Sequence, residues 1–299
     1  MKVKRVMSSH ERHDTRNFYI YILPWLISFF LLTLYPMIRS LWLCFTDSDF
    51  SGRGNFIGLD NFTKAFTQDP LFFKVFANTL YYVAMFVPAS LVLSFFIAWL
   101  LSQKIRMLGF FRTVFYLPYI TSGVAVTIMW GWIFNSDYGL INYLLSLVGI
   151  TGPRWLTDKR IAMISIVIMC LWSIGNNILI MLAGIQDIPV TYYESARIDG
   201  ASTLRQIFSI TIPLCTPTIF FNLVVGTIGA FQLFNQPYVL TKGGPVDSTR
   251  TVSMYLFSHA FEYGKMGYGS TIAWCLFIII MFFTLVIQGS SRKWVFYDN

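Results

Sequence analysis

The stretch TYYESARIDGASTLRQIFSITIPLCTP, residues 191–217, interrupts a largely apolar chain with a cluster of charged side chains. Thr191 and Glu194 stand three residues apart, which is the spacing of a capping box, so a short helix is predicted to start near Tyr192. Gly200 follows, and glycine is common just past a helix end because it tolerates a left-handed backbone. The pattern predicts a short helix that ends at Gly200.

A second helix is predicted directly after this corner. Ser202 can act as its N-cap, and the helix would run toward Pro213. The charged residues of the stretch are Glu194, Arg197, Asp199 and Arg205. A helix, a glycine corner and a second helix would form a compact unit that faces water between two apolar segments.

The composition places those apolar segments in a membrane. Of the 299 residues, 56% are hydrophobic and 12% are charged, and mean hydropathy is +0.60, whereas soluble domains carry about 25% charged residues. About 20 apolar residues of helix cross a bilayer, and only helices or closed barrels satisfy their backbone there. The apolar runs are continuous, whereas the strands of a membrane β-barrel alternate apolar and polar residues, so a barrel is not indicated. Six stretches without Asp, Glu, Lys or Arg can each span once, as helices: 17–38, 75–103, 113–136, 161–186, 206–241 (with a broken or amphipathic lead-in) and 266–291.

The basic residues predict the orientation of these spans. If the N-terminus is cytoplasmic, the inside segments 1–16, 104–112, 187–205 and 292–299 hold 12 Lys and Arg in 52 residues. The outside segments hold 10 in 84 residues. The higher density inside favours cytoplasmic N- and C-termini and a cytoplasmic 187–205 loop. We therefore expect an N-terminal tail, 1–16, and a single transmembrane domain, 17–299.

Three short motifs carry a resemblance to a known family: Glu194-Ser195-Ala196, Asp199-Gly200-Ala201 and Ile212-Pro213-Leu214. Together they resemble the EAA loop of the permeases of binding-protein-dependent ABC importers, with Ser195 in place of an alanine. The resemblance implies that the 187–205 loop docks into a separate ATPase. It assigns this coupling role to Tyr193, Glu194, Ser195, Ala196, Asp199, Gly200 and Ala201. The alternative is a purely structural helix-turn-helix loop in another membrane protein.

A second resemblance narrows the family. Leu240-Thr241-Lys242-Gly243-Gly244-Pro245 is similar to the L-T-x-G-G-P signature of MalF-like sugar permeases. Gly58-Leu59-Asp60-Asn61-Phe62 and Trp155-Leu156-Thr157-Asp158 agree with it. The resemblance implies an all-α polytopic membrane protein with six transmembrane helices and a type I permease (MalF/MetI-like) core. It also implies these partners: a second, MalG-like permease subunit, ABC ATPase subunits, an extracytoplasmic solute-binding protein and a sugar substrate.

Polar residues inside spans three and four are candidates for the substrate path. Pro118 is predicted to kink span three, which would leave Tyr119, Ser122 and Gly123 beside a water-filled path or, alternatively, in a packing kink. In span four Trp172 and Asn176 are four residues apart and would share a helix face. Carboxamides within a bilayer are costly unless they bond across helices or line a wet cavity. Asn176 and, less directly, Asn177 are therefore candidates as well.

Span five offers a further polar set. Gln232, Asn235 and Gln236 follow the i, i+3, i+4 spacing and would form one stripe on a helix. Gly226 and Gly229 would allow close approach of a neighbouring helix. The stripe would line the substrate path or, alternatively, hold helices together through side-chain amides.

The chain shows no catalytic motif. It has no G-x-x-x-x-G-K-[ST] phosphate-binding loop, no Ser/His/Asp set, and no metal motif among its three histidines. We expect no cofactor on this chain, with ATP and Mg²⁺ used by the partner ATPase. Four scattered cysteines are expected in the core. The net charge of +8 is accounted for by basic residues beside anionic membrane lipid, not by nucleic acid.

The sequence as a whole predicts a permease subunit of an ATP-driven sugar or oligosaccharide importer in a bacterial-type inner membrane. One alternative is a permease for another solute. A stand-alone secondary transporter would need an ionisable coupling residue inside a span, and a membrane-embedded enzyme would need a nucleophile or a metal cluster. The charge-free spans favour a neutral, hydroxyl-rich substrate.

Overall fold

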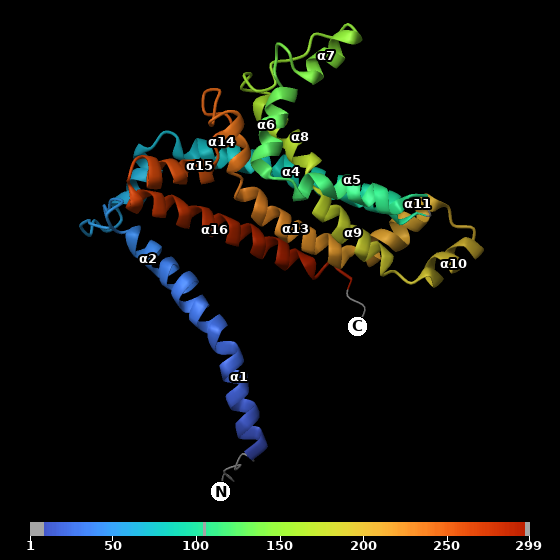
Figure 1. The fold of residues 1–299 in the computed structure, drawn as a ribbon, viewed down its shortest axis with the longest axis horizontal. Helices are drawn as coiled ribbons and strands as arrows, with labels where there is room; N and C mark the ends of the chain where they lie inside the picture. Colours follow the sequence, from blue (N-terminus) through green and yellow to red (C-terminus); the bar gives the residue numbers. More distant parts are fainter. Residues whose placement is uncertain (1–8, 104–105, 297–299) are drawn as a thin grey trace.

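The computed structural model describes residues 9–103 and 106–296, and this part of the chain is helical apart from loops and two isolated β-bridges. The long helices form an elongated bundle from which two segments project (Figure 1). Of the predicted tail 1–16, residues 1–8 lie outside the described residues. The first helix already begins at Ser9, so residues 9–16 are helical.

Four helical segments are long and apolar enough to cross a membrane. They are Asn17–Leu43, which comprises most of α1 (Ser9–Ser28), the π-helical segment η1 (Phe29–Leu34) and α2 (Tyr35–Leu43); α4 (Phe72–Ser102); Thr216–Leu240, which contains α13 (Thr216–Phe231) and α14 (Asn235–Leu240); and α16 (Met266–Ser291). They match predicted spans one, two, five and six. The lead-in to span five is helical without a gap from α11 (Thr203–Gln206) through the π-helical segment η3 (Ile207–Thr211) to α12 (Ile212–Leu214), so the predicted break is replaced by a π-helical turn.

Predicted spans three and four are bent pairs of helices. Helices α5 (Leu108–Ile120) and α6 (Gly123–Ile133) meet at 97°, and α8 (Ala162–Trp172) and α9 (Gly175–Gln186) meet at 50°. Counting each pair as one span gives six in the described chain. The all-helical, six-span prediction is therefore confirmed.

Helix α4 is the centre of the bundle and packs against α8, α9 and α13. Its buried residues recur every three or four positions, including Val75, Thr79, Val83 and Val87. The buried hydroxyl of Thr79 donates to Val75 O at 2.8 Å, so it adds no unpaired polar group. Its other face carries exposed apolar side chains, as expected of a helix that contacts lipid.

The N-terminal segment α1–α2 projects away from the bundle (Figure 1). None of the most apolar window of Asn17–Leu43 is buried. The segment contacts the bundle near its own C-terminal end, where Trp274 Nε1 of α16 donates a hydrogen bond to Ser40 Oγ of α2 at 3.1 Å. A continuous apolar surface of this length requires lipid or another membrane protein around it.

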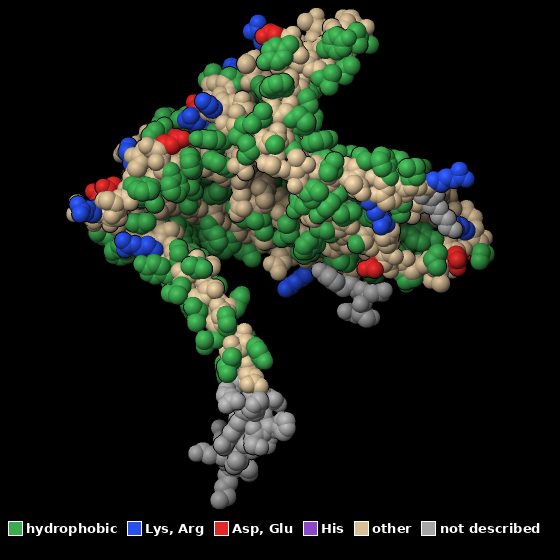
Figure 2. All heavy atoms as spheres, in the orientation of Figure 1, with side chains coloured by type: hydrophobic (Ala, Val, Ile, Leu, Met, Phe, Trp, Pro, Cys, Tyr) green, Lys and Arg blue, Asp and Glu red, His purple; other side chains and the backbone are tan. Residues whose placement is uncertain are grey.

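Charged side chains lie mainly toward the extremities of the molecule on the face shown in Figure 2, and apolar side chains cover much of the surface between them. One extremity carries α10 (Val190–Ile198) and α11, and the opposite one carries α15 (Val252–Phe257) and the loops around it. We call these the α10 end and the α15 end. The distribution is that of a protein whose apolar surface crosses a bilayer.

A partly buried polar cluster joins the elements of the α15 end. Asp69 Oδ2 accepts hydrogen bonds from Tyr255 Oη at 2.5 Å and from Tyr268 Oη. His259 packs edge-on against both rings, with centroids 4.5 Å from Tyr255 and 4.7 Å from Tyr268. Desolvation opposes ionisation of Asp69, but the two donated hydrogen bonds lower its pKa. The cluster ties the segment before α4 to α15 and to the start of α16.

The cluster predicts a stability that depends on pH. Burial lowers the pKa of His259 to about 4. The negative charge of Asp69 acts in the opposite direction and raises this pKa, whereas the positive charges of Lys265, Lys64 and Arg250 lower it further. An unfolded histidine binds its proton near pH 6.5, so the unfolded state binds more protons between pH 6.5 and 4. Stability contributed by neutral His259 is full above about pH 6.5 and is lost as pH falls toward 4. We expect the midpoint temperature of thermal unfolding to fall as the pH is lowered from 6.5 to 4. In His259→Gln this midpoint should depend less on pH. Equal slopes in both proteins would contradict this.

Candidate functional site

Three helix breaks converge on one cavity of about 500 Å³, which we call the central cavity. The breaks lie between α5 and α6, between α8 and α9, and between α13 and α14. Irregular backbone at membrane depth is tolerated where it lines a cavity, and transporter sites occur at such discontinuous helices. The polar residues that line the cavity are Tyr82, Tyr119, Thr121, Thr127, Ser173, Asn176, Asn177, Gln232, Asn235 and Gln236.

The five carboxamides in this wall form no side-chain link between helices of the described chain. Their side chains make no hydrogen bond to any described residue, whereas buried Asn222, outside the cavity, donates to Thr218 O at 3.1 Å. The lining contains no Asp, Glu, Lys, Arg or His. Each carboxamide offers two N–H donors and an acceptor oxygen. The cavity is therefore an uncharged surface rich in free hydrogen-bonding groups.

The structure separates the predicted residues of spans three and four into two groups. Tyr119, Gly123, Asn176 and Asn177 line the central cavity, and Ser122 does not. Trp172 lies in a different, apolar hollow with Leu93 and Trp130 among its neighbours.

The prediction that Trp172 and Asn176 share a helix face is wrong. The two residues belong to different helices, α8 and α9, which are bent by 50° at Ser173 and Ile174. The predicted kink of span three is present, but the helix continues through Pro118 to Ile120 and breaks afterwards.

Span five also differs in detail from the prediction. Gln232, Asn235 and Gln236 all line the central cavity, but not as a stripe on one helix, because α13 ends at Phe231 and α14 begins at Asn235. No helix of the described chain makes the predicted close approach at Gly226 and Gly229. A side chain added at either position would meet no atom within 4 Å. Both glycines line the central cavity and widen it.

The candidate residues chosen from the sequence did not include four polar residues of the wall, and for two of them a local signal existed. Thr121 and Ser173 stand at helix breaks, each two residues before a glycine. The Thr121 hydroxyl donates to Leu117 O at 2.8 Å, a bond to the preceding turn that often accompanies a bend in a helix. The sequences TSG and SIG within apolar runs therefore marked the breaks. Tyr82 and Thr127 carried no comparable signal.

The predicted exposed loop, 187–205, contains helix α10. The capping box is wrong: α10 begins at Val190 after Pro189, its N-cap makes no side-chain hydrogen bond, and Thr191 lies inside the helix. The C-terminal end agrees with the prediction. Gly200 has φ +74°, Gly200 N–H donates to Arg197 O at 3.1 Å and Ala201 N–H donates to Ala196 O at 2.8 Å. These two bonds form a Schellman motif.

Helix α11 follows at once, as predicted. Ser202 is its N-cap, and its Oγ accepts from Arg205 N at 3.4 Å. Glu194, Ser195, Asp199 and Ala201 of the loop lie at or near the surface of the α10 end, whereas Tyr193 is turned inward and its hydroxyl lies 3.0 Å from Thr211 Oγ1. Ala196 is half-buried.

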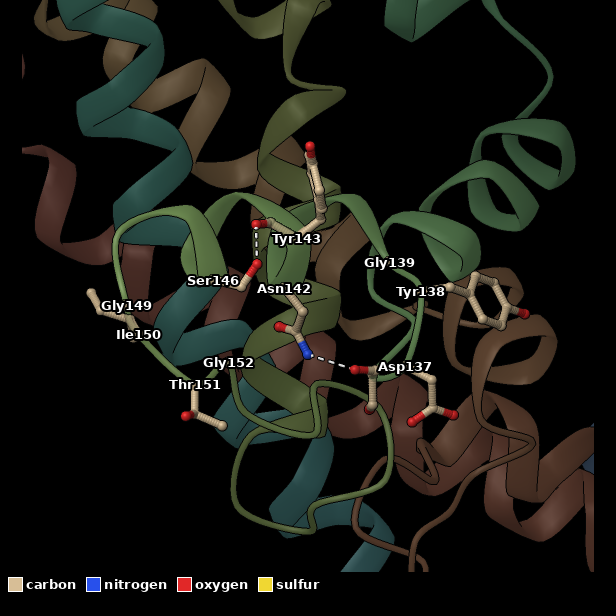
Figure 3. Close-up of a pocket in the computed structure, with 11 residues that line it drawn as sticks. Asp137, Tyr138, Gly139, Asn142, Tyr143, Ser146, Gly149, Ile150, Thr151 and Gly152 are labelled. Carbon is tan, nitrogen blue, oxygen red and sulfur yellow. Dashed lines mark hydrogen bonds between the residues drawn. The ribbon is translucent and has the colours of Figure 1, made fainter.

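A separate hollow of about 740 Å³ lies on the hairpin that contains α7 (Leu140–Leu147) (Figure 3). Its central side chain, Asn142, donates to Ser136 O at 3.0 Å and Pro153 O at 3.3 Å and accepts from Trp155 Nε1 at 2.7 Å. The hydrogen-bonding groups of the Asn142 carboxamide are thus paired within the hairpin itself. The hollow contains none of the predicted site residues. All four cysteines are buried, as expected, and no group of metal-ligating side chains occurs within 9–103 and 106–296.

Comparison with protein families identifies the architecture. Residues 70–293 match the model of the binding-protein-dependent transport system inner membrane component. The chain belongs to this family. The matched segment runs from α4 to α16 and contains all three helix breaks and the exposed loop.

Two proteins with similar sequences are named as transporter permeases. A probable ABC transporter permease protein of Bacillus subtilis, YesP, is 41% identical over 96% of this chain and 94% of its own length. The lactose transport system permease protein LacF of Rhizobium radiobacter is 33% identical over 96% and 97%. Near-complete coverage means that the similarity extends over the family domain and the N-terminal segment α1–α2.

A solved structure shows the same fold. A chain of a bacterial alginate ABC transporter, in complex with an alginate-bound periplasmic protein, superposes with a TM-score of 0.79 and 23% identity. The match covers 94% of this chain and 96% of that chain. This family permease therefore has the ABC importer type I permease fold.

Proposed function

We propose that this chain is a permease subunit of an ATP-driven importer of neutral saccharides. The observation that carries the proposal is the central cavity, whose wall presents five unpaired carboxamides and no charge. Saccharide hydroxyls can donate to the carboxamide oxygens and accept from their N–H groups. Tyr119 adds an aromatic ring and a hydroxyl. The lactose permease among the relatives supports the same substrate class.

The proposal includes a second permease subunit, because the central cavity is open and a transport path needs a complete wall. It includes a separate ATPase that docks on the exposed loop through Glu194, Asp199 and neighbouring residues, and a solute-binding protein at the α15 end. The alginate transporter, whose structure includes such a periplasmic protein, supports this arrangement. ATP and Mg²⁺ would be bound by the ATPase. Basic-residue density supports cytoplasmic termini and a cytoplasmic α10 end.

The mechanism we propose is alternating access. ATP-driven movement of the ATPases shifts α10 and α11, and the shift changes the packing of the helices around the central cavity. Coupling requires that the ATPase bind the loop unequally in the two states. The uncharged wall argues against a secondary transporter, which needs an ionisable residue for ion coupling. An importer of another neutral solute remains the second candidate, and the choice of probes in the test separates the two.

The test is reconstitution of the complete transporter with the second permease, ATPase and binding protein of its own gene neighbourhood. A panel of neutral di- and trisaccharides is first tested for binding to the binding protein by thermal shift, and the sugar that binds is used for uptake into proteoliposomes. We expect uptake that requires ATP. Each of Asn176→Leu, Gln232→Leu and Asn235→Leu should lower uptake about two- to tenfold, from the loss of one hydrogen bond.

Gln288→Leu is the matched control, since Gln288 is an exposed carboxamide of α16 outside the central cavity. Uptake by this variant should equal that of the wild type. Uptake without ATP, or a binding protein that recognises only a non-saccharide solute, would contradict the proposed function. Normal uptake in all three cavity variants would show that the carboxamides do not contact the substrate.

A further inference from the structure

Helix α10 is held loosely against the rest of the molecule. None of its nine residues is buried. A second cavity, of about 520 Å³, lies behind it and is lined by the last turns of α4 and α9 and by α11. We call it the loop cavity. The backbone connections at the two ends of α10, near Pro189 and Gly200, are its covalent attachments.

Tyr193 bridges the loop cavity. Its ring packs against the buried cluster formed by residues such as Leu101, Ile185 and Cys215. Its hydroxyl reaches Thr211 Oγ1 at 3.0 Å, the one hydrogen bond from an α10 side chain to another element within the described chain. Burial raises the pKa of Tyr193, so the hydroxyl keeps its proton at neutral pH.

Thr211 lies at the base of the helix that leads to the central cavity. It is 1% exposed and ends the π-helical segment η3, in which Ile212 N–H donates to Ile207 O. Such π-turns are often found at functional sites. Pro213 and Pro217 follow within the next six residues, and α13 then continues to Gly226 and Gly229 in the wall of the central cavity.

We propose that Tyr193 is a positioning residue that transmits movement of α10 to the base of span five through its hydrogen bond with Thr211. This inference rests on the proposed function and names the contact through which the exposed loop acts. The tyrosine side chain has few rotatable bonds, so a displaced α10 carries the hydroxyl with it. Without that bond α10 can turn about its two ends while η3 stays in place, because the ring alone slides over apolar neighbours.

The test uses variants that separate the hydrogen bond from packing. Tyr193→Phe keeps the ring and removes the hydroxyl, and Thr211→Val keeps the volume and removes the partner. Thr211→Ser keeps the hydroxyl and is the matched control. In the reconstituted transporter we expect Tyr193→Phe and Thr211→Val each to lower sugar moved per ATP hydrolysed about two- to tenfold. Thr211→Ser should stay near wild type. Thr211→Val also removes the 3.4 Å hydrogen bond from Thr211 Oγ1 to Gln206 O. The double variant should therefore be no worse than Thr211→Val alone, since the bond that Tyr193→Phe removes is already absent there.

Amide hydrogen exchange in α10 of the assembled complex provides a second measurement, which does not depend on transport. Exchange should rise in Tyr193→Phe and Thr211→Val and remain unchanged in Thr211→Ser. Wild-type sugar-to-ATP ratios in both hydroxyl-deleted variants, or additive losses in the double variant, would overturn the inference. Failure of the wild-type chain to co-purify with an ATPase would instead refute the proposed function, so the two failures are distinguishable.

Discussion

Replacing Gly200 with valine is expected to uncouple sugar uptake from ATP hydrolysis by at least tenfold. Gly200 occupies the left-handed position of the Schellman motif that ends α10, with φ +74°. A side chain there would meet no atom within 4 Å, so the cost comes from the backbone. That conformation costs about 1–2 kcal/mol for an ordinary L-residue, and more for a β-branched one. The strain is relieved if the backbone leaves this region, which redirects α11 relative to α10.

The matched control is Gly200→Asn, because asparagine adopts the left-handed region more readily than other side chains. It should keep most of the coupling, although it too adds a side chain to the surface. The measurement is sugar uptake and ATP hydrolysis in proteoliposomes, together with the amount of complex recovered from membranes. Full coupling in Gly200→Val would show that this corner does not transmit movement. Equal losses in both variants would point to the added side chain, not the backbone.

The spans were predictable because they depend on length and charge alone. A run of 22 or more residues without a charged side chain is long enough to cross a bilayer as a helix, and burial details do not change that. The Schellman corner at Gly200 and the cap at Ser202 were also predictable, since both are local. The start of α10 was missed because Pro189 supplies a fixed φ, of −58°, and the helix begins directly after it.

The central cavity was only partly predictable because the breaks that form it differ in origin. Two of them carry local signals, Thr121 before Ser122-Gly123 and Ser173 before Ile174-Gly175. The break in span five has no glycine or proline between Gln232 and Phe234. There the carbonyl of Leu233 accepts a buried hydrogen bond from Thr251 at 2.7 Å, eighteen residues away. A contact of this kind replaces a helical bond with a tertiary one and leaves no pattern in the local sequence.

Replacing Gly175 with valine is expected to prevent assembly of the bundle around the central cavity. Gly175 is the first residue of α9, and a side chain there would lie 2.4 Å from Phe115 O and 2.9 Å from Tyr116 Cα of α5. Both are backbone atoms and cannot rotate away as the end of a side chain can. Gly175→Ala should already cost about 1–3 kcal/mol through overpacking, and valine more.

Gly109→Ala is the matched control. Gly109 lies in α5, the helix that Gly175 of α9 approaches, and a side chain at position 109 would meet no atom within 4 Å. Alanine has a higher helix propensity than glycine. This variant should therefore unfold at or above the unfolding temperature of the wild type. Thermal unfolding in detergent and the yield of monodisperse protein measure both effects. A Gly175→Val protein with wild-type stability would mean that α5 and α9 can separate without loss. Tyr119 of α5 and Asn176 of α9 line the same cavity next to this contact. Such a result would therefore also require the central cavity to form without the close approach of Gly175 to α5.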